Sequence, residues 1–326
     1  VVVSGVHGVE VQTEKDWEFA EDFRIPVLFF VSKMDRENAD FDRTVGELRK
    51  YLSEKAVPLF LPIGKEASFK GVVDVLSGKA FLYRGDGSKD FTEMDVPPEM
   101  ADEVQSARES LVERIVEADD ELMMRYLDGE QISTEELSKA LRTAVAKRSL
   151  FPVFPGSSTA NVGICQLLDV LVDVMPSPLD MPPREAQKNG ETIQVKPGLD
   201  EPFSALCFKV MVDPYVGKLS FLRVFSGSLT SDQVLFNVNK GEEERISAFK
   251  FMKGKDGEDQ KEIVCGDIVV IPKLHSTTVG DTLATKGTSF QFPPIQFPQP
   301  IYSVAVTPKS RADEDKLSNA IHRMRE

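Results

Sequence analysis

The residues of this 326-residue chain best suited to chemistry lie in a short polar loop, Ser32-Lys33-Met34-Asp35. The loop follows the apolar run 25–31, whose branched and aromatic residues are typical of a strand buried on both faces of a parallel sheet. Ligands of such sheets bind beyond the carboxyl ends of the strands, where this loop lies. A carboxylate such as Asp35 can accept hydrogen bonds from two neighbouring N–H donors of a ligand. The alternative is that the loop only caps the following helix.

The loop resembles the guanine-recognition motif of GTPases, Asn-Lys-x-Asp, with Ser32 in place of the asparagine. The resemblance implies that Asp35 accepts from the N1–H and the exocyclic amine of guanine, which adenine lacks in this arrangement. Gly156-Ser157-Ser158 follows the apolar run 150–154 and resembles the motif Ser-Ala, whose backbone N–H meets guanine O6. Taken alone, Ser157 would only cap a helix. The predicted guanine site consists of Ser32, Lys33, Asp35, Gly156, Ser157 and Ser158.

A GTP site also needs the phosphate loop Gly-x4-Gly-Lys-Ser/Thr and an Asp-x-x-Gly segment near the metal and the γ-phosphate. Neither motif occurs between Val1 and Glu326. Backbone amides for the phosphates and a hydroxyl for Mg²⁺ are therefore missing. We expect this chain to bind GDP or GTP very weakly, to hold no Mg²⁺, to contain no catalytic residue or metal ligand, and not to hydrolyse GTP.

Composition and charge narrow the class of protein. With 41% apolar and 28% charged residues, the chain is typical of a soluble globular protein, and no apolar stretch approaches the length of a membrane span. Its three widely spaced cysteines predict buried thiols in a reducing cytoplasm, rather than disulfides or a zinc site. The net charge of −14 disfavours non-specific nucleic-acid binding. Most of the acidic excess lies in residues 86–136, with seventeen acids against four bases.

The hydrophobic patterns predict a parallel α/β region that is interrupted by an insertion. Its expected strands are 1–3, 25–31 and 150–154, and its expected helices are 13–23, 40–53 and 163–174. The inserted part has short strands at 58–63 and 71–83 and one long helix from Pro98 to about Leu127, with a narrow apolar stripe. A second helix begins at Ser133, which forms a capping box with Glu136, and ends near Arg148.

The rest of the chain shows a different pattern. Residues 181–200 have no periodicity and are predicted to be a linker, whereas 202–284 alternate like the strands of a small barrel. A strand at 301–306 and a helix at 312–325 are expected last, the helix burying Leu317, Ala320, Ile321 and Met324. One strand and one helix cannot bury a core, and Val1 already belongs to a predicted strand. We therefore expect the chain to be a fragment, cut at both ends.

Segments along the whole chain, in the same order, resemble bacterial elongation factor G. They include Val9-Glu10-x-Gln12-Thr13, Lys33-Met34-Asp35-Arg36, Leu61-Pro62-Ile63-Gly64, Asp213-Pro214-Tyr215-Val216-Gly217-Lys218 and Val306-x-Pro308-Lys309. The resemblance implies a multidomain α/β plus β fold. Its parts are a partial P-loop-GTPase-type α/β domain (1–63 and 150–180), an inserted α+β subdomain (64–149), the linker (181–200), a translation-factor β-barrel (201–288) and the beginning of a ferredoxin-like α+β domain (296–326).

The same resemblance implies a ribosome-associated GTPase that promotes translocation of tRNA and mRNA and uses GTP, GDP and Mg²⁺ in its full-length form. Its partners would be the ribosomal RNA, facing Lys218 and Arg223, and the ribosomal stalk protein, facing the acidic insert; both groups could instead be solvated surfaces. We expect the insert to pack as an independent subdomain whose acidic helix faces solvent. Alternatives are an elongation factor G-like paralogue, a related ribosome-rescue step in place of translocation, a ribosomal protection protein, a class II release-factor-type GTPase, or a ribosome-binding module without GTPase activity.

Overall fold

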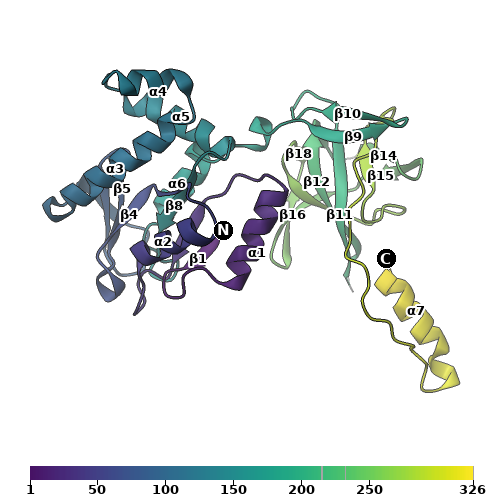
Figure 1. Cartoon of the computed structure of the whole chain (residues 1–326). Coiled ribbons are helices and arrows are strands. Elements are labelled where there is room, and N and C mark those ends of the chain that lie inside the picture. Colours follow the sequence, from purple (N-terminus) through teal and green to yellow (C-terminus); the bar gives the residue numbers. More distant parts are fainter. Residues whose placement is uncertain (214–215, 232, 326) are drawn as a thin grey trace. The chain divides into compact units, whose positions relative to one another are not determined.

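The computed structural model describes residues 1–213, 216–231 and 233–325, which belong to two compact units (Figure 1). The first unit spans Val1–Pro176 and the second begins at Ser177. Each unit has a hydrophobic core of its own. The first unit carries the predicted site.

A four-stranded parallel sheet forms the centre of the first unit, as the α/β pattern predicts. Every residue of its two inner strands is buried, because helices cover both faces and the strands must be apolar throughout. The strands, in spatial order, are β1 (Val2–Ser4), β2 (Phe29–Ser32), β8 (Phe151–Pro155) and β3 (Ala56–Pro58). The accompanying helices are α1 (Val11–Asp22), α2 (Phe41–Tyr51) and α6 (Ile164–Asp173).

A second, antiparallel sheet follows β3 after a single residue, Leu59. The predicted strand 58–63 is therefore divided between two sheets. The antiparallel sheet has the sequential order β4 (Phe60–Ile63), β5 (Gly71–Asp74), β6 (Lys79–Tyr83) and β7 (Phe91–Asp95). Short 3-10 turns lie at Glu66–Ser68 and Pro98–Met100.

The single long helix predicted to reach Leu127 is wrong, because the structure has two helices there, α3 (Ala101–Val116) and α4 (Asp120–Leu127). The break occurs because the Asp119 carboxylate accepts from the N–H groups of Glu121 and Leu122 and so begins a new helix. Helix α5 (Thr134–Ala146) begins with the predicted capping box of Ser133 and Glu136.

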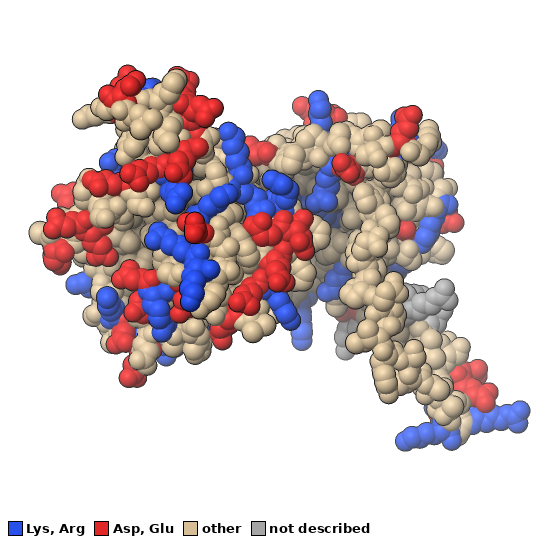
Figure 2. Space-filling model, viewed as in Figure 1, with Lys and Arg blue, Asp and Glu red and all other residues tan. Residues whose placement is uncertain are grey.

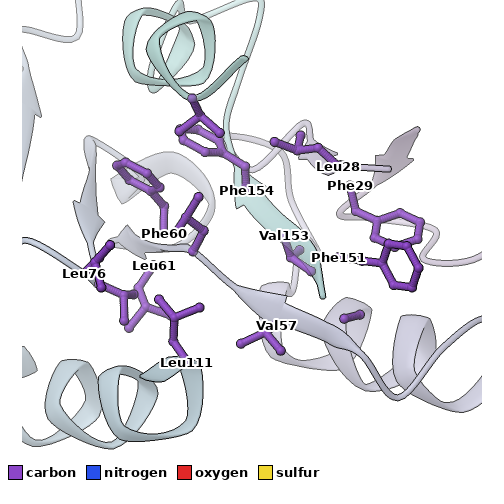
Figure 3. Close-up of a cluster of buried hydrophobic side chains, with 14 of the residues drawn as sticks. Leu28, Phe29, Val57, Phe60, Leu61, Leu76, Leu111, Phe151, Val153 and Phe154 are labelled. Atoms are coloured by element: carbon purple, nitrogen blue, oxygen red, sulfur yellow. The ribbon is translucent and has the colours of Figure 1, made fainter. Parts of the chain in front are cut away.

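The prediction that the insert packs as an independent subdomain is also wrong. One hydrophobic cluster joins Phe29 and Phe154 of the parallel sheet to Leu61 of β4 and Leu111 of α3 (Figure 3). The rings of Phe60 and Phe154 lie with their centroids 4.5 Å apart. The apolar stripe of α3 is wider than predicted, since Val112 and Val116 are buried beside Leu111 and Ile115. This wide face requires more cover than a small sheet provides.

The second unit contains the predicted antiparallel β structure around a core that includes Phe203, Leu222, Phe249 and Val269. Its largest described sheet has the order β15-β14-β20-β11-β12-β19-β16-β17. The strands are β11 (Ser204–Asp213), β12 (Gly217–Ser226), β14 (Val234–Asn237), β15 (Glu242–Arg245), β16 (Phe249–Lys253), β17 (Asp256–Gln260), β19 (Ile268–Pro272) and β20 (Thr282–Ala284). A separate pair consists of β13 (Ser228–Thr230) and β18 (Glu262–Val264).

The predicted linker at 181–200 contains regular structure, which corrects the prediction of an aperiodic segment. Strands β9 (Arg184–Lys188) and β10 (Glu191–Val195) form a hairpin that follows a 3-10 turn at Pro178–Asp180. Its two-residue loop is Asn189-Gly190, with φ of 52° and 88°. Positive φ at both positions is what the twist of a tight hairpin requires, and Asn-Gly is its strongest sequence signal.

The last described segment differs from the prediction in two respects. Residues 301–306 form no strand, and Ile301 and Tyr302 are exposed. Helix α7 (Glu314–Arg325) follows a 3-10 turn at Arg311–Asp313, but it does not bury its apolar residues: Ile321 is 51% and Met324 88% exposed. A strand needs a paired neighbour and an amphipathic helix needs an apolar surface to pack on, and among the described residues this segment has neither contact.

Candidate functional site

The two predicted loops lie side by side at the carboxyl edge of the parallel sheet, because β2 and β8 are neighbouring strands. Main-chain hydrogen bonds join them directly. The N–H of Gly156 donates to the carbonyl of Val31 at 2.9 Å, and the N–H of Met34 donates to the carbonyl of Gly156 at 3.3 Å. Residues that are more than a hundred positions apart in the sequence are thus held in one rigid corner of the sheet.

Position 156 has room only for glycine, because no space is left for a side chain. A Cβ added to it would lie 2.6 Å from a ring carbon of Phe30, well inside van der Waals contact. The Phe30 ring in turn packs on Phe154, with centroids 6.3 Å apart. The absence of a side chain lets the second loop approach β2 closely enough to form the bonds described above.

Asp35 has an arrangement that favours a ligand. Its side chain is 22% exposed, and its Oδ2 lies 3.6 Å from Nε of Arg36. Its Oδ1 is buried and has no hydrogen-bond partner among the described residues. A buried acceptor without a donor is costly, so a ligand that brings an N–H group to Oδ1 would be bound favourably. Guanine, with adjacent N1–H and amine donors, fits this requirement.

Ser32 is placed differently from a base-contacting residue. Its side chain is buried, and its hydroxyl donates to the carbonyl of Val3 on β1 at 3.2 Å. Its own carbonyl accepts from the N–H of Gly5 at 2.8 Å. Ser32 therefore ties β2 to β1 and to the loop that follows β1.

The other predicted residues occupy distinct positions. Lys33 is exposed and has a left-handed backbone with φ of 62°. Ser157 is buried; its N–H and carbonyl both bond with Val162, and its hydroxyl accepts from Ala160 at 3.1 Å. Ser158 is exposed, and among the described residues its N–H has no partner. The N–H of Ser158 is therefore a backbone donor of this loop that no described residue uses.

Sequence reasoning missed the residues that hold the loop after β1. Arg43 of α2 donates through Nη2 to the carbonyls of Gly5 and Val6, at 3.0 and 2.6 Å. Glu47, one turn later, accepts from the N–H of Val9 at 2.9 Å. Their i,i+4 spacing resembles an ordinary helix-surface ion pair, so the sequence offers no signal for these long-range bonds.

The described residues do not fit a magnesium site. No group of three or more His, Cys, Asp or Glu side chains among them is placed to hold a metal. The phosphate-loop hydroxyl that would bind Mg²⁺ is also missing from the sequence.

Burial raises the pKa of the Cys207 thiol to about 12, so this thiol is not a nucleophile near neutral pH. No described helix is long and apolar enough to span a membrane.

Comparison with protein families identifies the fold and its domain order. Residues 1–177 match the elongation factor Tu GTP-binding domain, 202–286 match elongation factor G domain 2, and 297–326 match elongation factor G domain III. The chain belongs to the translational GTPases of the elongation factor G type. The match to domain III lies where the expected third domain begins, although the strand predicted at 301–306 does not form.

A solved structure supports this assignment. A crystal structure of a protein from Thermus thermophilus matches 99% of this chain with a TM-score of 0.83 and 31% sequence identity. The match covers 46% of that protein, so the chain spans slightly less than half of its length. The multidomain α/β plus β arrangement is therefore shared over essentially the whole chain.

Proposed function

We propose that this chain supplies the guanine-binding half of the nucleotide site of an elongation factor G-type GTPase. The observation that carries the proposal is the buried Oδ1 of Asp35, which has no donor among the described residues. It lies where two neighbouring loops are joined by main-chain hydrogen bonds. Because these bonds hold the main chain of both loops in place, less conformational freedom is lost when a base binds.

In this proposal each residue has a limited and distinct task. Asp35 accepts from N1–H and the exocyclic amine of guanine, and the Ser158 N–H donates to O6. Lys33 flanks the base, while Ser157 and Gly156 fix the second loop. Ser32 acts through its bond to Val3, by holding β2 against β1. The phosphates of GTP or GDP, and Mg²⁺, require residues that this sequence does not contain.

We further propose that the protein acts in the cytoplasm on the ribosome and promotes translocation of tRNA and mRNA. Membership of the elongation factor G type supports this role. The acidic surface of α3 and α4 is a candidate contact for the ribosomal stalk protein, and Figure 2 displays acidic side chains gathered there. On the second unit, Lys218 and Arg223 of β12 are candidate contacts for ribosomal RNA.

A second candidate is a ribosome-binding module without GTPase activity. The observation in its favour is Ser32, which replaces the motif asparagine and directs its hydroxyl to β1. A ribosomal protection protein or a class II release-factor-type GTPase would share the guanine half proposed here. These alternatives differ in what the protein does on the ribosome, so the nucleotide test below bears on the first proposal alone.

The test compares Asp35→Asn with Ser32→Ala in a protein that joins this chain to a phosphate loop. Asp35→Asn should weaken GDP binding by at least about 100-fold, because two charge-assisted hydrogen bonds of about 1.5–3 kcal/mol each are altered. Ser32→Ala should change it by less than about fivefold, since a neutral bond to Val3 is worth about 1 kcal/mol. Titration calorimetry measures both. Equal losses in the two variants would refute the assignment of roles.

A further inference from the structure

A pocket lies at the amino ends of the parallel strands, opposite the carboxyl ends where the guanine site lies. It has a volume of about 510 Å³ and opens beside the amino ends of β3 and β8. Four cationic residues, Arg24, Lys55, Lys147 and Arg148, line it, and we call it the basic pocket. Glu21 is the one acidic residue among its described lining residues. Four positive charges in one cavity are unexpected in a chain with a net charge of −14.

Arg148 is the most deeply placed of these residues. Only 10% of its side chain is exposed, and it forms an ion pair with Glu21 through Nη2. Its Cζ lies 5.6 Å from the ring centroid of Phe151 and 6.0 Å from that of Trp17. Its Nε is buried and has no hydrogen-bond partner among the described residues. The guanidinium is therefore held firmly at the wall of the pocket, where its positive charge can attract an anion.

The backbone conformation of two of the arginines also suggests a functional role for the basic pocket. Arg24 and Arg148 directly follow the last turns of α1 and α5 and have left-handed φ values of 51° and 59°. Around them, Ile25 N–H bonds to Ala20 and Ser149 N–H bonds to Ala144, the pattern of a helix C-terminal motif. Glycine is the usual residue at that position because it adopts positive φ without strain. An arginine there is a conflict between local preference and sequence, a feature that is often found at functional positions.

The two lysines make only main-chain contacts. Lys55 Nζ donates to the carbonyl of Arg148 at 3.3 Å, and Lys147 Nζ donates to the carbonyl of Ala118 at 3.4 Å. Neither ammonium has an acidic partner among the described residues, so both charges are available to a ligand. Helices α1, α2 and α5 all end near this pocket, and each contributes about half a negative charge there. Among the lining residues alone, the balance stays positive after these contributions are counted.

We propose that the basic pocket binds a small polyphosphate anion, such as a free di- or triphosphate group. Lys55, Lys147, Arg24 and Arg148 would neutralise the phosphate oxygens. The volume of about 510 Å³ suits a small ligand rather than the backbone of an RNA. Exposed acids, Glu18, Asp22 and Glu54, adjoin the lining residues in sequence and would repel the phosphates of a longer strand. Nothing in this site depends on the guanine half at the other edge of the sheet.

The experiment uses inorganic pyrophosphate and the 326-residue chain. Trp17 lines the pocket and is the only tryptophan, so its fluorescence reports on this site alone, and titration calorimetry provides an independent measure. We expect saturable binding at constant ionic strength. Replacing Lys55→Gln and Lys147→Gln together removes two charges and keeps both hydrogen-bond donors, so the affinity should fall at least about tenfold.

The control pair is Lys70→Gln with Lys139→Gln, two exposed lysines outside the pocket that give the same change in net charge. Both control variants, and Asp35→Asn, should bind pyrophosphate as the unaltered chain does. Two results would overturn the proposal: no saturable heat on titration, or equal affinities of the pocket double variant and the control double variant for pyrophosphate. The basic residues of the pocket would then only cap helix ends. Tighter binding of polyuridylate than of pyrophosphate, lost in the pocket pair, would overturn it in favour of an RNA site.

Discussion

At the scale of single residues, Gly156 is the position on which the geometry of the guanine corner depends most. Gly156→Ala would place a methyl group 2.6 Å from the Phe30 ring, and overpacking of this kind typically costs about 1–3 kcal/mol. We expect a loss of that size in the free energy of unfolding of the first unit, measured by urea denaturation. The matched control is Gly46→Ala in α2, where a Cβ meets nothing within 4 Å. That variant should gain about 0.5–1 kcal/mol instead; similar effects of both variants would contradict the steric argument.

The sequence located Asp35 because residue type and position after a buried strand are sufficient to suggest its role. It did not reveal the bond from Ser32 to Val3, 29 residues away, or the bonds from Arg43 to the loop after β1. These contacts join segments that come together only when the sheet forms. No spacing in the chain records them, and the same is true of the contact between Gly156 and Phe30.

At the scale of elements, the buried carboxylate of Glu244 on β15 ties that strand to residues 275–277. Glu244 is 3% exposed and accepts from the N–H groups of His275, Ser276 and Thr277 and from two hydroxyls. Burial alone would raise the pKa of this carboxyl, but these hydrogen bonds hold its pKa below the usual value. The lowered pKa means that the ionised form stabilises the folded state.

This linkage predicts how stability depends on acidity. The contribution of Glu244 is fully present above the ordinary glutamate pKa of about 4.3 and is lost as the pH falls through the lower folded-state pKa. Thermal denaturation of the second unit should be measured at several pH values between about pH 6 and pH 3. As the pH falls, the melting temperature should drop more steeply in the native chain than in Glu244→Gln. Parallel curves for the two proteins would exclude this role of Glu244.

The elements were predictable where local signals are strong. Apolar runs located β2 and β8, and the Ser133–Glu136 capping box located the start of α5. The break at Asp119 was missed because the apolar spacing continues across it, although an aspartate cap interrupts the helix. The Asn189-Gly190 turn was missed because its flanking strands are largely exposed and show no apolar alternation. The strand expected at 301–306 depends on a pairing edge, which no local pattern encodes.

At the scale of the whole molecule, the acidic surface of α3 is open to a test of charge. Glu109 and Glu113 are exposed, and attraction to a basic partner should speed association and weaken with salt. Reversing both charges in a longer protein that contains this chain should slow ribosome-stimulated GTP turnover at low salt, and less so at high salt. The control reverses Glu185 and Glu191, exposed acids of the β9–β10 hairpin. An unchanged rate at both salt concentrations would leave these acids as a solvated surface.

The central claim is that Asp35 recognises the guanine base through hydrogen bonds. The preference of the protein for one nucleotide base over another tests this claim most directly. Xanthine carries a carbonyl where guanine has its amine, so an asparagine amide at position 35 can donate to xanthine but cannot accept both guanine donors. The measurement is the competition of GDP and xanthosine diphosphate for native and Asp35→Asn forms of a protein that joins this chain to a phosphate loop. We predict that native protein prefers GDP and that Asp35→Asn prefers the xanthine nucleotide. An Asp35→Asn variant that keeps the native preference for GDP would contradict the account.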